Sequence, residues 1–231
     1  MELFYQPEGI EATQLDKVES RHCLKVLRRK EGDSIHLVDG KGNFIQAEIT
    51  GTENKICSYE VIDCKTQEPL EYHTHLVVAP TKNHDRMEWL VEKAVEIGVN
   101  EFSFVVCQHS ERRKLNLERL NKKAITAMKQ SLKARLPIIN PVSSFMELIE
   151  LVPVAYHKFI AYVPAKEQQL KDMIPRQKNY CLLVGPEGGF SKEEVAAAEG
   201  TGFQVVSLGN HRLRTETAAL VGCHTFHLMN S

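Results

Sequence analysis

The chain lacks the features that would place it in a membrane or direct it out of the cell. None of its 231 residues falls in a run that approaches the roughly 18 apolar residues of a membrane-spanning helix. The first residues, Met1 to Gln6, lack the charged and apolar regions of a signal peptide. We therefore expect a cytoplasmic protein that makes no membrane contact.

The sequence is also poor in metal and nucleotide motifs. Its six cysteines lie far apart with no C-x-x-C pair, so they indicate neither a zinc site nor a disulfide framework. The histidine pairs His73/His75 and His224/His227 have no third ligand nearby in the sequence, and packing is the simpler interpretation. Because G-x-G-x-x-G and G-x-x-x-x-G-K-[ST] are both absent, ordinary NAD binding and P-loop nucleotide hydrolysis lose their main support. We expect no bound metal.

The charge is nearly balanced overall, at a formal value of -1, but it is unevenly distributed. Residues 21–30 contain five lysines or arginines and no acid, and residues 112–135 contain nine against a single acid, Glu118. Such a stretch is often only the solvated face of a helix, although two of them in one chain favour a nucleic-acid partner.

Short β-like segments dominate the first 70 residues. Ser34–Val38 is followed by a turn-rich stretch at residues 39–43, and Phe44–Ile49 then alternates apolar and polar residues, as expected for a hairpin with one buried face. A further strand is predicted over Ile56–Ile62. A sheet of only a few strands leaves unpaired edges unless it closes on itself or is covered. We therefore expect a small β-barrel domain over residues 1–70.

Beyond residue 70, strands alternate with helices, which predicts a parallel sheet covered on both faces in a second domain, residues 71–231. The spacing of Asp85 and Glu88 suggests a capping box at the start of one helix, and Gly98 its end. Asn116 is expected to cap the basic helix. The strands are predicted at His75–Ala79, Phe102–Cys107, Phe159–Val163, Cys181–Val184 and Val205–Leu208. The helix that begins near Asp85 is expected to have an apolar face of Met87, Leu90, Val91, Ala94 and Ile97. The basic helix is expected to have an apolar face of Leu117, Leu120, Ala124, Met128 and Leu132.

The most informative chemistry follows the last two predicted strands, where ligands of open parallel sheets bind. After the first of them the chain turns through Gly185-Pro186-Glu187-Gly188-Gly189, and Ser191 with Glu194 then forms a capping box for the next helix. Three glycines allow a ligand to approach bare backbone. A tight strand-to-helix turn is the alternative interpretation, but the whole cluster favours a binding loop.

The second element, Leu208 to Ala218, again runs from a strand to a helix, for which Thr215 is a possible cap. It places Arg214 and Glu216 near the start of that helix. An arginine among backbone amides can stabilise negative charge, whereas Glu216 either takes a proton or forms a structural ion pair with the arginine.

Together these residues resemble the RsmE family, SPOUT-class enzymes that methylate N3 of a uridine in bacterial 16S ribosomal RNA. The resemblance is carried by G-P-E-G-G-F at Gly185–Phe190 and by L-G-x-x-x-L-R-x-E-T-A at Leu208–Ala218. It extends over nearly the whole chain, through His22–Arg28, Glu92–Val99 and Gln130-Ser131.

The resemblance implies an α/β fold: a C-terminal SPOUT domain with a deep trefoil knot, preceded by a PUA-like barrel that helps hold RNA. It also implies a homodimer, S-adenosyl-L-methionine as methyl donor and S-adenosyl-L-homocysteine as product, with the loop after Val163 as a third wall of the pocket. The donor-binding residues implied are Leu183, Val184, Gly185, Pro186, Glu187, Gly188, Gly189, Leu208, Gly209, Asn210, Leu213 and Arg214.

For catalysis, the enzyme must align the acceptor nitrogen with the sulfonium methyl and remove a proton from the uridine. Arg214 is the first candidate for stabilising the resulting anion, with Glu187, Glu216 or Gln130 as weaker candidates for handling the proton. Nitrogen methylation needs no cysteine nucleophile, so Cys223 is assigned to packing. The RNA, free or within the small ribosomal subunit, is expected to contact Arg21, Lys25, Arg28, Arg29, Arg112 and Arg113. Two alternatives stay open: a sister SPOUT enzyme acting on another RNA atom, and a non-catalytic RNA-binding ribosome factor.

Overall fold

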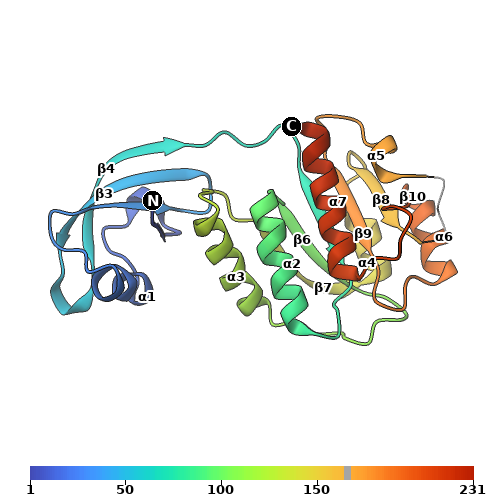
Figure 1. The fold of residues 1–231 in the computed structure, drawn as a ribbon, viewed down its shortest axis with the longest axis horizontal. Coiled ribbons are helices and arrows are strands. Elements are labelled where there is room, and N and C mark those ends of the chain that lie inside the picture. Colours follow the sequence, from blue (N-terminus) through green and yellow to red (C-terminus); the bar gives the residue numbers. More distant parts are fainter. Residues whose placement is uncertain (164–167) are drawn as a thin grey trace. The chain divides into compact units, whose positions relative to one another are not determined.

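The computed structural model describes residues 1–163 and 168–231 (Figure 1). The chain separates into two compact units, one of Met1–Pro69 with Ile125–Leu136, and one of Leu70–Ala124 with Pro137–Ser231. The first unit therefore takes in a short later segment of the chain in addition to the N-terminal residues.

The N-terminal unit is built on a mixed sheet in the order β1-β2-β3-β4. The hairpin prediction is confirmed, because β2 and β3 pair antiparallel, with Leu37 opposite Ile45. Along β3 the apolar side chains alternate with exposed polar ones, so only one face of the strand enters the core. The strands are β1 (Leu3–Tyr5), β2 (Ser34–Val38), β3 (Asn43–Gly51) and β4 (Ser58–Thr66).

Short helical segments lie between these strands. Helix α1 (Lys17–Arg21) begins after Asp16, whose side chain accepts a hydrogen bond from the Glu19 N–H, and it continues directly into the π-helical turn η2 (His22–Val26). Two short 3₁₀ turns, η1 (Gly9–Glu11) and η3 (Glu53–Lys55), complete the helical segments of this part.

Residues Ile125–Leu136 group with the N-terminal strands because polar contacts join them. The Gly42 N–H donates to the Ala134 carbonyl at 2.9 Å, and the Arg135 guanidinium donates to the carbonyls of Lys41 and Gln67, each at 2.7 Å. These bonds satisfy carbonyl groups of an otherwise irregular turn.

The C-terminal unit contains a parallel sheet in the order β10-β8-β9-β5-β6-β7, which confirms the predicted parallel architecture. The edge strand β7 was not predicted. Its Asn140-Pro141 pair argues against a strand from sequence, but a proline is tolerated on an edge strand, and the pairing with β6 is irregular there. The strands are β5 (Thr74–Val78), β6 (Glu101–Val106), β7 (Ile138–Ser144), β8 (His157–Ala161), β9 (Tyr180–Val184) and β10 (Gln204–Val206).

Helices cover both faces of this sheet, so its strands are apolar on both sides. Figure 1 shows α2 (His84–Ile97) and α7 (Thr215–Asn230) side by side over one face. On that face Phe226 of α7 stacks on the Tyr180 ring at 4.7 Å. The opposite face packs against α4 (Phe145–Leu151) and α6 (Lys192–Gly200) through side chains that include Leu183 and Ile160. The remaining helices are α3 (Leu117–Gln130) and α5 (Leu170–Met173).

The helix ends confirm several predictions and correct others. Gly98 ends α2 in a left-handed conformation, and Ser191 and Glu194 form the expected capping box of α6. The prediction that Asp85 caps α2 is wrong: Asn83 is the cap, and its side chain accepts from the Asp85 N–H.

The end of the basic helix also differs from the prediction. Asn116 caps α3 as expected, by accepting from the Arg119 N–H at 3.0 Å. Leu132, however, does not extend the apolar face, because α3 ends at Gln130 and Leu132 lies exposed in a turn with a positive φ. A period of hydrophobic residues cannot show where a helix stops when no glycine or proline marks the end.

A partly buried polar cluster lies at the amino-terminal end of β5 and β6, with His75 and Ser103 as its buried members. The His75 ring contacts the Ser103 hydroxyl at 2.8 Å, and Asn140 donates to both Ser103 and the Glu101 carboxylate. His73 contacts the other Glu101 oxygen at 3.2 Å. Burial lowers the pKa of His75 to about 4. The negative charge of Glu101 raises this pKa but offsets only part of the shift.

This cluster predicts a pH-dependent stability. The unfolded chain binds a proton at His75 near its ordinary pKa of 6.5, whereas the folded chain does not until about pH 4. Stability conferred by neutral His75 is therefore complete above pH 6.5 and is lost as the pH falls, by about 2 kcal/mol between pH 7 and pH 5. Urea unfolding at the two pH values measures this difference. His75→Asn keeps a hydrogen-bonding group beside Ser103 and should remove this difference in the free energy of unfolding. An unchanged difference in that variant would exclude His75 as the source of the pH dependence.

Candidate functional site

Three loops at the carboxyl ends of the neighbouring strands β10, β8 and β9 surround a cavity of about 730 Å³. This volume lies within the range of small-molecule sites, and the position is the one at which open parallel sheets bind ligands. The lining residues are Ala161, Tyr162, Val163, Val184, Gly185, Pro186, Glu187, Gly188, Gly189, Phe190, Ser207, Leu208, Gly209, Asn210, His211, Arg212, Leu213, Arg214, Thr215 and Ala218.

The loop after β9 needs its first glycine because of a close side-chain approach. A Cβ on Gly185 would lie only 3.0 to 3.1 Å from the ring of Phe190, which is itself buried against the sheet. The ring can therefore fold under the loop only when residue 185 is bare backbone. Gly185, Pro186 and Phe190 therefore give the cavity an apolar surface, and the Glu187 side chain beside them is exposed.

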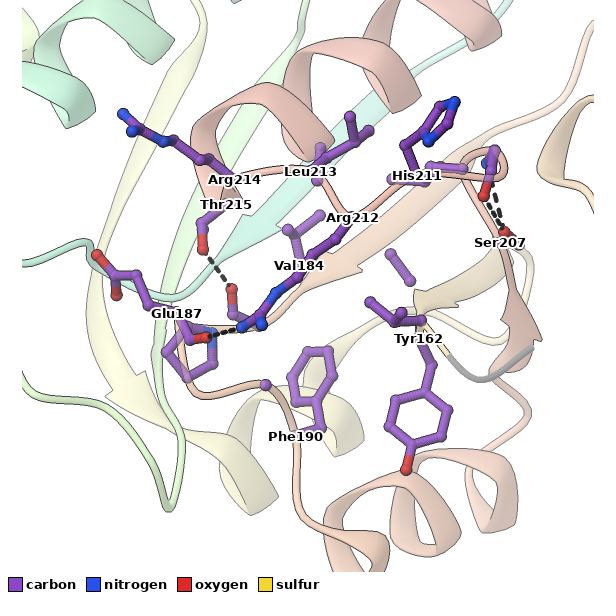
Figure 2. Close-up of a pocket in the computed structure, with 18 of the residues that line it drawn as sticks. Tyr162, Val184, Glu187, Phe190, Ser207, His211, Arg212, Leu213, Arg214 and Thr215 are labelled. Carbon is purple, nitrogen blue, oxygen red and sulfur yellow. Dashed lines mark hydrogen bonds between the residues drawn. The ribbon is translucent and has the colours of Figure 1, made fainter. Parts of the chain in front are cut away.

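The loop after β10 is shaped by its own turn and held to the loop after β9. Ser207 donates to the Gly209 carbonyl and accepts from its N–H, and Gly209 takes a φ of 125°, which is disfavoured for other residues. Thr215 at the start of α7 donates to the Gly185 carbonyl at 2.9 Å, and Arg212 donates to the Glu187 carbonyl at 3.1 Å. Figure 2 shows these two bonds joining the loops.

The cavity has two chemically different sides. In Figure 2, the rings of Tyr162 and Phe190 lie on one side of the view, while the Arg214 and Glu187 side chains extend to the other. Among the residues described, the N–H groups of Gly185, Asn210 and Leu213 have no hydrogen-bond partner within the protein. The arrangement therefore suits a ligand with an aromatic or apolar part, polar edges for backbone recognition, and a reacting end near an arginine and a carboxylate.

The structure brings together every predicted donor-binding residue except Leu183. Leu183 is fully buried within β9, where it pairs with Ile160 and Val77, and it does not line the cavity. The strands β8 and β10 both end earlier than predicted, at Ala161 and Val206, so their last expected residues belong to the cavity loops. Ala161–Val163 line the cavity, but the loop expected as a third wall begins after them, and its residues 164–167 lie outside the described part of the chain.

Two catalytic candidates line the cavity and two do not. Arg214 and Glu187 are exposed at its rim. Glu216 is buried in the first turn of α7, and its carboxylate lies 3.6 Å from Arg86 of α2, so the alternative of pairing with Arg214 is wrong. Gln130 ends α3, in the segment that groups with the N-terminal strands.

The cap of α7 also needs correction, and Cys223 lies away from the cavity. Arg214, not Thr215, occupies the N-cap position. Its side chain makes no capping hydrogen bond to α7, and this leaves the guanidinium available to the cavity. Cys223 is buried among apolar groups, and burial raises its pKa to about 12. Such a thiol is a poor nucleophile at neutral pH.

The sequence motifs place Phe190 and Arg212 in the two predicted pocket loops but assign them no individual role. Thr215 directly follows the second loop, and this position was the one signal that it shares the cavity. Their individual contacts depend on how two loops meet in space, and no local pattern predicts that.

The two basic stretches differ in the structure. Arg21, Lys25 and Arg29 line a second cavity, in the N-terminal unit, whereas Arg28 is exposed and is not among the lining residues. In the other stretch, Arg113 is exposed, and Arg112 donates to the Lys82 carbonyl and contacts the His84 ring. Cations of α3 form ion pairs: Arg119 with Glu88, Lys122 with Glu118, Lys123 with Glu92 and Lys129 with Glu19.

Comparison with known families gives two matches that together span most of the chain. Residues 67–227 match the RNA methyltransferase domain, and residues 15–61 match the RNA methyltransferase PUA domain. The first match contains all three loops of the first cavity, and the second match contains all the residues that line the second cavity.

Individual relatives agree with these matches. The ribosomal RNA small subunit methyltransferase E of Aquifex aeolicus is 30% identical over 199 residues, which cover 84% of this chain and 85% of the relative. A crystal structure of a probable rRNA-methyltransferase from Porphyromonas gingivalis is 41% identical, with a TM-score of 0.94, and covers 100% of this chain and 98% of that one. The Neisseria gonorrhoeae ribosomal RNA small subunit methyltransferase E bound to S-adenosyl methionine is 29% identical, with a TM-score of 0.89 and the same coverage of both chains.

Proposed function

The chain belongs to the RNA methyltransferase family that includes ribosomal RNA small subunit methyltransferase E, and we propose that it methylates N3 of a uridine in 16S ribosomal RNA. The observation that carries the proposal is the cavity formed by the three loops of the sheet, because it combines the family motifs in one pocket. S-adenosyl-L-methionine is the methyl donor.

The cavity fits this donor by its shape and its donor groups. Phe190 and Val184 provide apolar surface for a purine ring, and the unpartnered N–H groups of Asn210 and Leu213 suit its polar edge or the ribose. The bare backbone at Gly185 leaves room for close approach. When bound, the donor supplies an electrophilic methyl group, so the reaction needs no metal, and among the described residues no cluster suited to a metal is found.

The residues at the rim then position the uridine and its charge. Arg214 has no carboxylate partner among the described residues, so its guanidinium is free to stabilise the anion that forms as N3 loses its proton. Glu187 extends toward the same side in Figure 2 and accepts from the Lys82 N–H at 3.1 Å, which fixes one carboxylate oxygen. Its other oxygen can orient the uridine or accept the proton.

The rest of the chain serves the same reaction. Residues 1–70 act as a PUA-like domain that holds RNA, and residues 71–231 act as the SPOUT domain. The SPOUT domain contains a trefoil knot; the return of α7 from the edge strand β10 to β9 and β5 is consistent with such threading. The protein works as a homodimer on the small subunit or its RNA in the cytoplasm, and two subunits together complete the active site. No helix in the described part of the chain is long and apolar enough to cross a membrane.

Loss of the gene tests this function in the cell. Ribosomal RNA from a strain that lacks the gene should lose one 3-methyluridine of the small subunit, measured by digestion and mass spectrometry, and the intact gene should restore it. Unchanged 3-methyluridine would contradict the proposal, and loss of a different methylated nucleoside would identify a sister enzyme.

A further inference from the structure

The N-terminal unit contains a second cavity, of about 1040 Å³, between one face of α1 and η2 and the turn around η3. Small-molecule sites typically measure about 300 to 1,000 Å³, so this cavity has room for a nucleotide with part of its neighbours. It is lined by Lys17, Ser20, Arg21, Leu24, Lys25, Arg29, Lys30, Glu31, Thr52, Asn54, Lys55 and Ile56.

The lining is strongly cationic. Its six lysines and arginines face one acid, Glu31, and among the described residues none of the six has a carboxylate within salt-bridge distance. The cations of α3, in contrast, are mostly paired with acids. Unpaired cations gathered around one hollow attract a polyanion far more strongly than cations already balanced by acids.

The floor of the cavity is apolar. Leu24 and Ile56 are half-buried and line it, and Leu24 also packs against the core of the N-terminal unit. Ser20 is fully buried beneath them, with its hydroxyl used in bonds to the Leu15 carbonyl and the Cys57 N–H. A surface that bound only duplex phosphates would need no such hollow, whereas an unstacked base needs apolar surface between cationic walls.

The backbone around the cavity is unusual on both sides. On one side η2 is a π-helical turn, a form that is frequent at functional sites, and Arg28 just beyond it has a φ of 57°. On the other side the consecutive residues Asn54 and Lys55 have φ values of 52° and 65°. Left-handed non-glycine residues are disfavoured, and they cluster where a structure maintains a binding geometry.

We propose that this cavity binds one unpaired nucleotide of the RNA, with its base on Leu24 and Ile56 and its flanking phosphates among the lysines and arginines. None of the described residues that line the cavity is aromatic, so the guanidinium planes of Arg21 and Arg29 provide the stacking surface. The inference rests on the proposed function in that RNA is the substrate, and it adds a second recognition point outside the methyl-transfer site.

Fluorescence anisotropy with the full-length protein tests the charge contribution. The probes are an oligouridylate too short to fold and an RNA duplex of the same length. Lys25→Gln with Arg29→Gln should weaken binding of the single strand about tenfold and reduce the salt slope by about 0.7 for each phosphate that the variant no longer neutralises. The matched control is Lys122→Gln with Lys123→Gln, which removes two ion-paired cations and should leave both quantities nearly unchanged. Equal weakening in the two variants would overturn the proposal.

A third variant tests the hollow itself. Thr52 is exposed on the cavity lining, and Thr52→Leu should narrow the cavity without removing a charge or adding an aromatic ring on which a base could stack. It is expected to weaken single-strand binding several-fold while duplex binding stays unchanged. A wild-type protein that prefers the duplex, or that binds neither probe, would overturn the proposal. Calorimetry with S-adenosyl-L-homocysteine, expected to be unchanged in all three variants, reports on the methyl-donor site separately, so failure here is distinguishable from failure of the proposed function.

Discussion

Replacing Arg214 with alanine is expected to lower the rate of methyl transfer by about 10² to 10³-fold, the usual cost of losing one positioned group that stabilises developing charge. The guanidinium is exposed at the cavity rim. Arg214 occupies the N-cap position of α7, but its side chain makes no capping hydrogen bond. The substitution should therefore leave the fold intact. Because the proposed donor contacts are mainly backbone groups of the three loops, binding of S-adenosyl-L-homocysteine should change little.

Single-turnover methylation of small-subunit RNA and calorimetry measure the two quantities separately. Arg214→Lys should recover part of the rate, since it restores the charge but not the planar geometry. The matched control is Arg176→Ala, which removes another arginine that does not line the cavity and should retain the wild-type rate. A wild-type rate in Arg214→Ala would remove this residue from the mechanism.

Replacing Gly222 with valine is expected to destabilise the C-terminal unit by about 3 kcal/mol or more, at the upper end of overpacking effects. A Cβ at this position of α7 would clash with the Leu182 Cδ2 atom of β9. Leu182 is itself fully buried, so it has little room to move away. The helix would have to lift from the sheet, and its first turn carries the Thr215 bond to the loop of Gly185. Donor binding should weaken together with stability.

The control for this variant is another helical glycine. Gly200 ends α6, and a Cβ there would meet nothing within 4 Å. Gly200→Ala should leave stability unchanged or raise it by up to about 1 kcal/mol. Urea unfolding of the two variants compares them directly. If Gly222→Val unfolds at the wild-type denaturant concentration, close contact between α7 and β9 does not hold the unit together.

The parallel sheet was predictable because its strands are nearly continuous apolar runs separated by helical periods. The edge strand β7 was not, since an edge strand accepts the polar and proline residues that a central strand excludes. The residue at which a helix starts was also not predictable from the sequence alone. Asn83 and Asp85 are both good N-cap residues, and only the backbone conformation selects Asn83.

The site was predictable in its location but not in its internal contacts. The motifs around Gly185 and Leu208 each follow a strand, so their meeting at one edge of the sheet follows from the parallel topology. The partner of Glu216 did not follow, because Arg86 lies about 130 residues away in the chain and reaches it only through the packing of α2 on α7. The ion pairs of the second basic stretch could not be predicted from the sequence either, because most of its acidic partners lie on other helices.

Methyl transfer from the pocket of the three loops to N3 of a uridine can be measured directly in small-subunit RNA. The experiment combines purified protein, small subunits or 16S RNA from a strain lacking the gene, and S-adenosyl-L-methionine with an isotopically labelled methyl group. The RNA is then digested and its nucleosides are analysed by mass spectrometry. We predict that the label appears in 3-methyluridine at a single position. Label in any other nucleoside, or no label in RNA although the protein binds the donor, would contradict the proposed function.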